Sequence, residues 1–144
     1  MADQGFIVND ATVSAIGTGY VLAKAIKLHG DTGSDANSRQ VPQACYLSHL
    51  EVTVDTASGS PTKLSAFLTY DSAGDEPLTG ESADNTLHAG LTNTSLLNTA
   101  ITLDVFFNAP ATQTTAGALY LFLKVDAGTV NCTKARLHWA MRGR

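Results

Sequence analysis

Apolar and polar residues alternate along much of this chain, which predicts β-strands because successive side chains of a strand point to opposite faces. In residues 118–125 the aliphatic side chains share one face: Leu119, Leu121, Leu123 and Val125. In residues 134–141 a second apolar face consists of Ala135, Leu137, Trp139 and Met141. A turn at residues 126–129 separates the two segments, so we predict that they form a hairpin around which the rest of the chain packs.

The same pattern predicts five further strands. Residues 11–16 and 20–29 are expected to form a first strand pair, separated by a Gly-Thr-Gly sequence. Residues 46–55 and 63–71 are expected to form a hairpin, and residues 101–107 add one more strand.

The strand at residues 46–55 carries the most regular alternation in the chain. We expect Leu50, Val52 and Val54 to face inward together with Tyr46. Leu47 is expected on the outward face, with the polar residues of the strand.

Turn-forming residues separate these strands, and one segment without any period, residues 72–98, is long. Seven to eight strands spaced in this way predict an all-β fold, an antiparallel two-sheet sandwich that is jelly-roll-like and carries one long irregular loop. We divide the chain into an N-terminal arm at residues 1–10 and a single β-sandwich domain at residues 11–144.

The composition agrees with one folded domain of this kind. The chain has 144 residues, of which 44% are hydrophobic and 15% charged, which excludes a disordered chain. The first residues contain neither a basic segment nor a long apolar run, so we expect no signal peptide and no membrane-spanning segment. We therefore expect synthesis in the cytoplasm.

Charge is distributed unevenly along the chain. The net charge is −4, yet the last eleven residues hold four basic groups and no acid: Lys134, Arg136, Arg142 and Arg144. The basic end is either an ordinary solvated strand edge or a contact for an acidic neighbouring subunit or a nucleic acid. Without interleaved aromatic residues it makes a poor nucleic-acid footprint, so we expect no specific nucleic acid as a partner.

Candidate chemistry is sparse. The four histidines, His29, His49, His88 and His138, are dispersed and form no metal-binding motif, so we expect no metal site, no cofactor and no enzymatic activity. The acidic residues of segment 72–98 would suit a glycosidase if two of them faced each other, but a solvated acidic loop explains them more simply. Cys45 and Cys132 are expected to be two buried thiols without a disulfide.

Three segments of the chain resemble one family. The runs GDEPLTGE (residues 74–81), NTAITLDVFF (residues 98–107) and GALYLFLKVDAGTVNCTKARLHW (residues 117–139) are similar to small β-sandwich virion proteins of tailed bacteriophages, of the capsid cement or decoration type. The resemblance implies a non-enzymatic subunit that binds the outer capsid surface and stabilises the head. Its partner would be the major capsid protein, with self-association, for example as a trimer, and no membrane contact.

Such a subunit needs an apolar or basic patch for its partner. Our candidates for partner binding are the basic C-terminal residues and three aromatic residues expected to point outward: Lys134, Arg136, His138, Arg142, Arg144, Phe106, Tyr120 and Phe122. The aromatic residues have an alternative explanation, burial beneath the long loop. The arm at residues 1–10 and the segment 72–98 are further candidates for reaching the capsid or neighbouring copies.

The alternative function is a carbohydrate- or receptor-binding β-sandwich module of a phage tail or head appendage. Such a module usually presents exposed aromatic side chains to its ligand. The single tryptophan, Trp139, lies in an apolar strand pattern and is expected in the core, which counts against this alternative.

Overall fold

The computed structural model describes residues 4–27, 44–75, 86–90, 97–108 and 118–141. The regular structure in these ranges consists of strands: β1 (Gln4–Asn9), β2 (Val13–Ile16), β3 (Val21–Lys27), β4 (Ala44–Ser58), β5 (Lys63–Thr69), β6 (Thr86–Ala89), β7 (Leu97–Asn108), β8 (Ala118–Val125) and β9 (Thr129–Ala140). No helix within the described ranges has the length and apolarity needed to cross a membrane.

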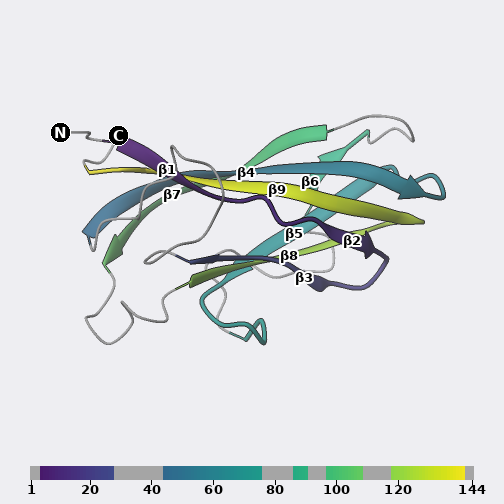
Figure 1. Ribbon diagram of the computed structural model, residues 1–144, viewed down its shortest axis with the longest axis horizontal. Helices are drawn as coiled ribbons and strands as arrows, with labels where there is room; N and C mark the ends of the chain where they lie inside the picture. Colours follow the sequence, from purple (N-terminus) through teal and green to yellow (C-terminus); the bar gives the residue numbers. More distant parts are fainter. Residues whose placement is uncertain (1–3, 28–43, 76–85, 91–96, 109–117, 142–144) are drawn as a thin grey trace.

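The strands form two antiparallel sheets packed face to face (Figure 1). The first sheet has the order β1-β9-β4-β7, and β2 pairs with β9 beyond the end of β1. The second sheet has the order β3-β8-β5-β6. If β1 and β2 together are lettered B and the other strands C to I in chain order, the two sheets are B-I-D-G and C-H-E-F, the order of a jelly roll. The expected all-β, two-sheet, jelly-roll-like sandwich is confirmed.

Three expected strand pairs are wrong, although the strands exist. β8 lies in the second sheet and β9 in the first, so residues 126–128 form an arch between the sheets and not a hairpin. β4 and β5 also lie in different sheets, and so do β2 and β3. Alternation shows which face of a strand is buried, and a hairpin and an arch can bury the same faces. The hydrogen-bonding partner of each strand therefore does not follow from the pattern.

Two strands lie where none was expected. Residues 4–9, within the segment set apart as an N-terminal arm, form β1, which pairs with β9 from Gln4 opposite Ala140 to Asn9 opposite Ala135. Ile7 and Val8 of β1 are fully buried, so this strand belongs to the sheet. β6 lies within the segment 72–98, which was expected to be irregular throughout.

A bulge in β4 reverses the expected orientation of Leu47. Leu47 lies opposite Trp139 and His49 opposite His138, so one extra residue of β4 lies between these pairs. Leu47 therefore faces the core, as Leu50 does, and both are fully buried, whereas Tyr46 is only half-buried. An inserted residue shifts the alternation by one position, which a pattern of period two cannot reveal.

The core lies between the inner faces of the two sheets and is mainly aliphatic. Its largest fully buried side chains are Ile7, Ile16, Ile26, Leu47, Leu50, Leu64, Leu68, Leu119, Leu121, Leu123 and Leu137. Trp139 is 5% exposed, as expected for a core residue. Cys45 and Cys132 are free and buried, also as expected, and burial raises the pKa of both thiols to about 11.

Two arches lock together at the end of the sandwich where β4 ends and β9 begins (Figure 1). The carboxylate of Asp126, in the β8–β9 arch, accepts hydrogen bonds from the backbone N–H groups of Thr62 (2.9 Å) and Lys63 (3.0 Å) and from the Thr62 hydroxyl (2.5 Å). The Asp126 N–H in turn donates to the Lys63 carbonyl at 3.2 Å. These bonds join the β8–β9 arch to the β4–β5 arch.

Glycines allow the two arches to touch. Gly59 and Gly128 both have positive φ, 67° and 65°. A Cβ at Gly128 would lie 2.2 Å from the carbonyl oxygen of Ser58, and a Cβ at Gly59 would lie 2.7 Å from the Cα of Gly128. No side chain fits between these backbones, so the approach depends on glycine at both positions.

Gly128→Ala should therefore destabilise the fold. The methyl group meets backbone atoms that cannot rotate away, and the left-handed backbone adds strain of about 1–3 kcal/mol. Gly19→Ala is the matched control, because a Cβ there meets nothing within 4 Å. Urea unfolding of the three proteins measures the difference; equal midpoints for Gly128→Ala and Gly19→Ala would contradict the contact between the arches.

The Asp126 junction should weaken in acid. Its hydrogen bonds from Thr62 lower the pKa of Asp126 from 3.8 to about 2 in the folded state. A group with a lowered folded pKa stabilises the fold above its unfolded pKa, and this stabilisation is lost as the pH falls through the folded value. The stability difference between the wild type and Asp126→Asn should thus be full above pH 4 and shrink toward pH 2.

Thermal unfolding of both proteins across this range tests the junction, with Asp75→Asn, in a different turn, as control. A difference that stays constant from pH 6 to pH 2 would show that the Asp126 carboxylate does not hold the arches together.

Candidate functional site

Polar side chains gather on the outer face of the first sheet, and most come from two neighbouring strands. In β4, Leu50, Val52 and Val54 are buried, so His49, Glu51 and Thr53 point outward. In β9 the buried residues are Ala135, Leu137 and Trp139, so the intervening residues Lys134, Arg136 and His138 point outward. We call the outward set the outer cluster: His49, Glu51, Thr53, Asn98, Lys134, Arg136 and His138.

Strand register brings these side chains together. On β4 and β9, His49 lies opposite His138, Glu51 opposite Arg136, and Thr53 opposite Lys134. Asn98 joins them because it lies opposite Thr53 on β7. Residues that are directly opposite on one face of an antiparallel pair are close enough to interact.

Two histidines and a glutamate form the centre of the outer cluster. The imidazole rings of His49 and His138 are stacked, with centroids 4.2 Å apart and planes at 11°. Nε2 of His138 contacts Oε1 of Glu51, and these two side chains are 25% and 28% exposed. One possible metal-ligating atom from each of the three side chains lies within 4.8 Å of the other two.

Hydrogen bonds from neighbouring side chains orient this centre. Nδ2 of Asn98 donates to Oε2 of Glu51 at 3.3 Å, and the Thr53 hydroxyl donates to Oδ1 of Asn98 at 3.1 Å. Oγ of Ser48, the residue inserted by the bulge, lies 3.0 Å from Nδ1 of His49 and donates to the backbone carbonyl of His138 at 3.2 Å. The bulge therefore also supplies a group that supports the histidine pair.

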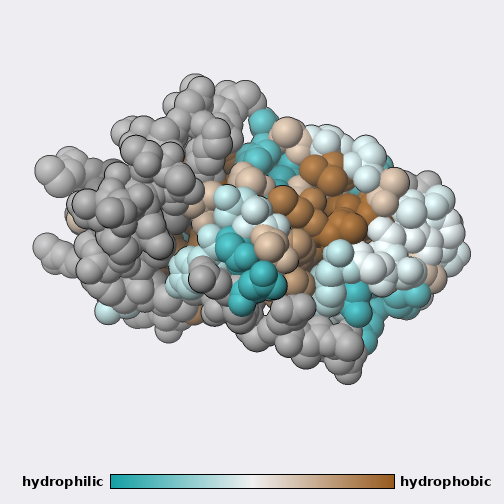
Figure 2. All heavy atoms as spheres, turned by 90° about the horizontal axis from the view of Figure 1, so that it is seen from below, coloured by the Kyte–Doolittle hydropathy of each residue, from teal (hydrophilic) through white to brown (hydrophobic). Residues whose placement is uncertain are grey.

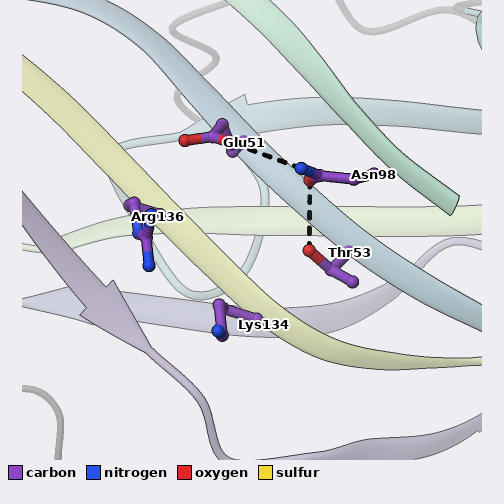
Figure 3. Close-up of a pocket in the computed structure, with 5 residues that line it drawn as sticks. All are labelled: Glu51, Thr53, Asn98, Lys134 and Arg136. Carbon is purple, nitrogen blue, oxygen red and sulfur yellow. Dashed lines mark hydrogen bonds between the residues drawn. The ribbon is translucent and has the colours of Figure 1, made fainter. Parts of the chain in front are cut away.

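Next to this centre lies a small open hollow, shown in Figure 3. Glu51, Thr53, Asn98, Lys134 and Arg136 line it, and its volume is about 90 Å³. Sites for drug-sized ligands typically occupy about 300–1,000 Å³. The hollow is large enough for a carboxylate group or a few water molecules, but not for a whole sugar or nucleotide.

Strand β1 borders the outer cluster with an aromatic side chain. The guanidinium of Arg136 lies over the Phe6 ring, 4.5 Å from its centroid, which is cation–π geometry. The Phe6 ring also contacts His138, with centroids 5.9 Å apart. β1 thus positions two residues of the outer cluster as well as closing the edge of the sheet.

The surroundings shift the protonation of the central groups. Burial lowers the pKa of His49, and the neighbouring His138 lowers it further, against the opposing effect of Glu51. Burial raises the pKa of Glu51, but the hydrogen bonds from His138 and Asn98 and the charges of His138 and Arg136 outweigh it and lower the pKa overall. Both shifts favour a neutral His49 and an ionised Glu51 at neutral pH.

The residues expected to bind a partner fall into separate places. Lys134, Arg136 and His138 lie together in the outer cluster. Tyr120 and Phe122 lie on β8, in the other sheet. Phe106 lies on β7 opposite Tyr46, and its side chain is outside the described part of the structure, as are Arg142 and Arg144.

The outer face of the second sheet carries an aromatic cluster. The rings of Phe122 and Phe67 are stacked, with centroids 4.9 Å apart, and Tyr20 packs edge-on against Phe67. Phe122 is only 8% exposed, and a Cβ at Gly74 would lie 3.3 Å from its ring, so the turn after β5 lies over it. Phe122, which was expected to point outward, is therefore largely buried, with the turn at Gly74 against its ring.

The outer face of the second sheet also carries an exposed hydrophobic patch. Figure 2 shows this face, seen from below the view of Figure 1. Two residues of β3, Val21 and Leu22, are 42% and 38% exposed. Leu22 lies opposite Phe122 on the neighbouring strand, so it extends the aromatic cluster toward the sheet edge.

The sequence interpretation missed His49 and Glu51. One signal was available, since residues two apart on a strand share a face, and His49-Leu50-Glu51 follows that spacing. Their contact with His138 depends on the register between β4 and β9, and Glu51 and His138 are 87 positions apart in the sequence. No local pattern contains that information.

Comparisons with known proteins add little to this picture. No protein-family model matches the chain, and no curated protein matches it either. One solved structure, that of infectious bursal disease virus, Gx strain, contains a chain with 12% sequence identity and a TM-score of 0.49. The match covers 96% of this chain but only 32% of the other, so this protein spans about a third of that chain. At this level of similarity the fold assignment rests on the strand order itself.

Proposed function

We propose that this protein is a non-enzymatic structural subunit of a virion, which binds the outer surface of a tailed-phage capsid as a cement or decoration protein. The resemblance of three sequence segments to such proteins motivates the proposal. The observation that carries it is the outer cluster, an ordered, charged face on a jelly-roll sheet whose hollow fits a carboxylate and not a larger substrate.

The geometry suits an acidic protein surface. Lys134 and Arg136 both line the hollow. Lys134 is exposed, and the guanidinium of Arg136 lies over the Phe6 ring, which holds it in place. A carboxylate from the partner would meet the positive charges of Lys134 and Arg136, opposed by the negative charge of Glu51, which also lines the hollow. Exposed charge pairs each contribute only about 0.2–1 kcal/mol. On a lattice of repeated subunits, such modest contacts are sufficient when several act together.

The proposed partner is the major capsid protein, and self-association, for example as a trimer, would raise the number of simultaneous contacts. The proposed location is the capsid surface of the virion. The carbohydrate-binding alternative has less support, because Trp139 is buried and the hollow is too small for a sugar ring.

The test is binding of the purified chain to expanded or emptied capsids of the phage that carries its gene. The wild type should bind at a stoichiometry set by the capsid lattice. Lys134→Ala combined with Arg136→Ala should weaken binding by about tenfold, which corresponds to about 1.4 kcal/mol, and should reduce its salt dependence. Lys124→Ala is the matched control, because Lys124 lies on the second sheet, over the Tyr20 ring.

Absence of binding at any lattice stoichiometry would contradict the proposed function. An equal loss of capsid affinity in Lys124→Ala and in the double variant would contradict the outer cluster as the docking face. It would not contradict capsid binding by the protein.

A further inference from the structure

We infer that His49, Glu51 and His138 form a binding site for a divalent transition-metal ion of the zinc type on the outer face of the first sheet. The inference rests on side-chain geometry alone and is independent of the proposed virion function. Zinc is bound in proteins by histidine nitrogens and carboxylate oxygens, and two histidines with one glutamate are a known donor set for it.

The three donors already converge. Their ligating atoms lie within 4.8 Å of one another, whereas bonds of about 2.0–2.2 Å to one tetrahedral ion place ligand atoms roughly 3.4 Å apart. Nε2 of His138 and Oε1 of Glu51 are in direct contact and must move apart to admit an ion, while the longer separations must shorten; both changes require side-chain rotations. His138 and Glu51 are a quarter exposed, so they have room to rotate without disturbing the core. The stacked rings of His49 and His138 must tilt apart so that both nitrogens point at the ion.

The hydrogen bonds of Ser48 select the tautomer of His49 that a metal needs. A hydroxyl has one proton, and that of Ser48 is donated to the backbone carbonyl of His138. Its contact with Nδ1 of His49 is therefore one in which Nδ1–H donates and the hydroxyl oxygen accepts. The proton of a neutral imidazole then lies on Nδ1, and the lone pair lies on Nε2, free to bind a metal ion.

The glutamate is oriented in the same way. Asn98 donates to Oε2 of Glu51, and Thr53 holds the Asn98 amide by donating to its oxygen. Oε1 is left facing Nε2 of His138, with which it makes a hydrogen bond. An ion bound between these two atoms would replace that hydrogen bond. Metal-binding side chains are commonly supported by such outer hydrogen bonds.

The charges around the centre limit its affinity for a cation. The two cations of the outer cluster, Lys134 and Arg136, oppose a third positive charge, and Arg136 is held over the Phe6 ring. We therefore expect moderate affinity and not the very tight binding of structural zinc sites.

The donor set excludes the common hard cations. Calcium takes six to eight oxygen ligands and magnesium a near-octahedral oxygen shell, and the cluster offers one carboxylate. With three protein ligands, a fourth position stays open toward solvent for a water molecule or a group from a neighbouring molecule.

Isothermal titration of the full, tag-free chain with zinc chloride tests the site. We expect one zinc ion per chain. His138→Gln and Glu51→Gln should each weaken binding by more than about 100-fold, beyond the roughly 10–100-fold loss expected for Ser48→Ala, which removes only a supporting group. His88→Gln, in β6 of the second sheet, is the matched histidine control and should bind as the wild type does.

A second measurement needs no variant. Cobalt added to the wild type should give the visible absorption of a four-coordinate site, and zinc should remove it. A proton–nitrogen correlation spectrum of the metal-free protein should show Nδ1 of His49 protonated. Absence of zinc binding in the wild type, unchanged binding in Glu51→Gln, or loss of binding in His88→Gln would each overturn the proposed site.

Discussion

The close contact between the two arches is the constraint on which the rest of the structure depends. Gly59 and Gly128 approach each other with no space for a side chain, and the Asp126 carboxylate bonds the β8–β9 arch to the start of β5. Each arch crosses from one sheet to the other, so the contact sets how the two sheets are placed. The link between β2 and β3 also crosses between the sheets, and it contacts the β8–β9 arch. The Val125 N–H donates to the carbonyl of Gly17 in this link at 2.9 Å.

The aliphatic residues on the inner faces of the two sheets determine which side chains point outward. β4 and β9 are the longest neighbouring pair and run through the middle of the first sheet. The bulge at Ser48 allows Leu47 and Leu50 both to face the core, and it places His49 opposite His138. The outer cluster is thus a consequence of how the core is filled. Its hydrogen bonds then order a set of polar side chains that would otherwise be free to move on the sheet surface.

The sequence predicted the fold class and most strand positions, because a strand with one buried face alternates apolar and polar residues along the sequence. It did not predict strand partners: β8 and β9 were expected as a hairpin and are joined by an arch. It missed β1 because only two of its residues, Ile7 and Val8, are fully buried, and these are adjacent and do not alternate. Of the candidate site, Lys134, Arg136 and His138 were found from their charge and spacing. His49 and Glu51 were not, since their role depends on a long-range register and on one inserted residue.

We propose that the outer cluster is the face that docks on a capsid. The most direct measurement is a cryo-electron microscopy reconstruction of capsids decorated with the protein, at a resolution that separates the two sheets. We expect the jelly roll to lie with the outer face of β4 and β9 against the capsid and with acidic capsid residues near Lys134 and Arg136. A bound molecule with that face turned to solvent would contradict it.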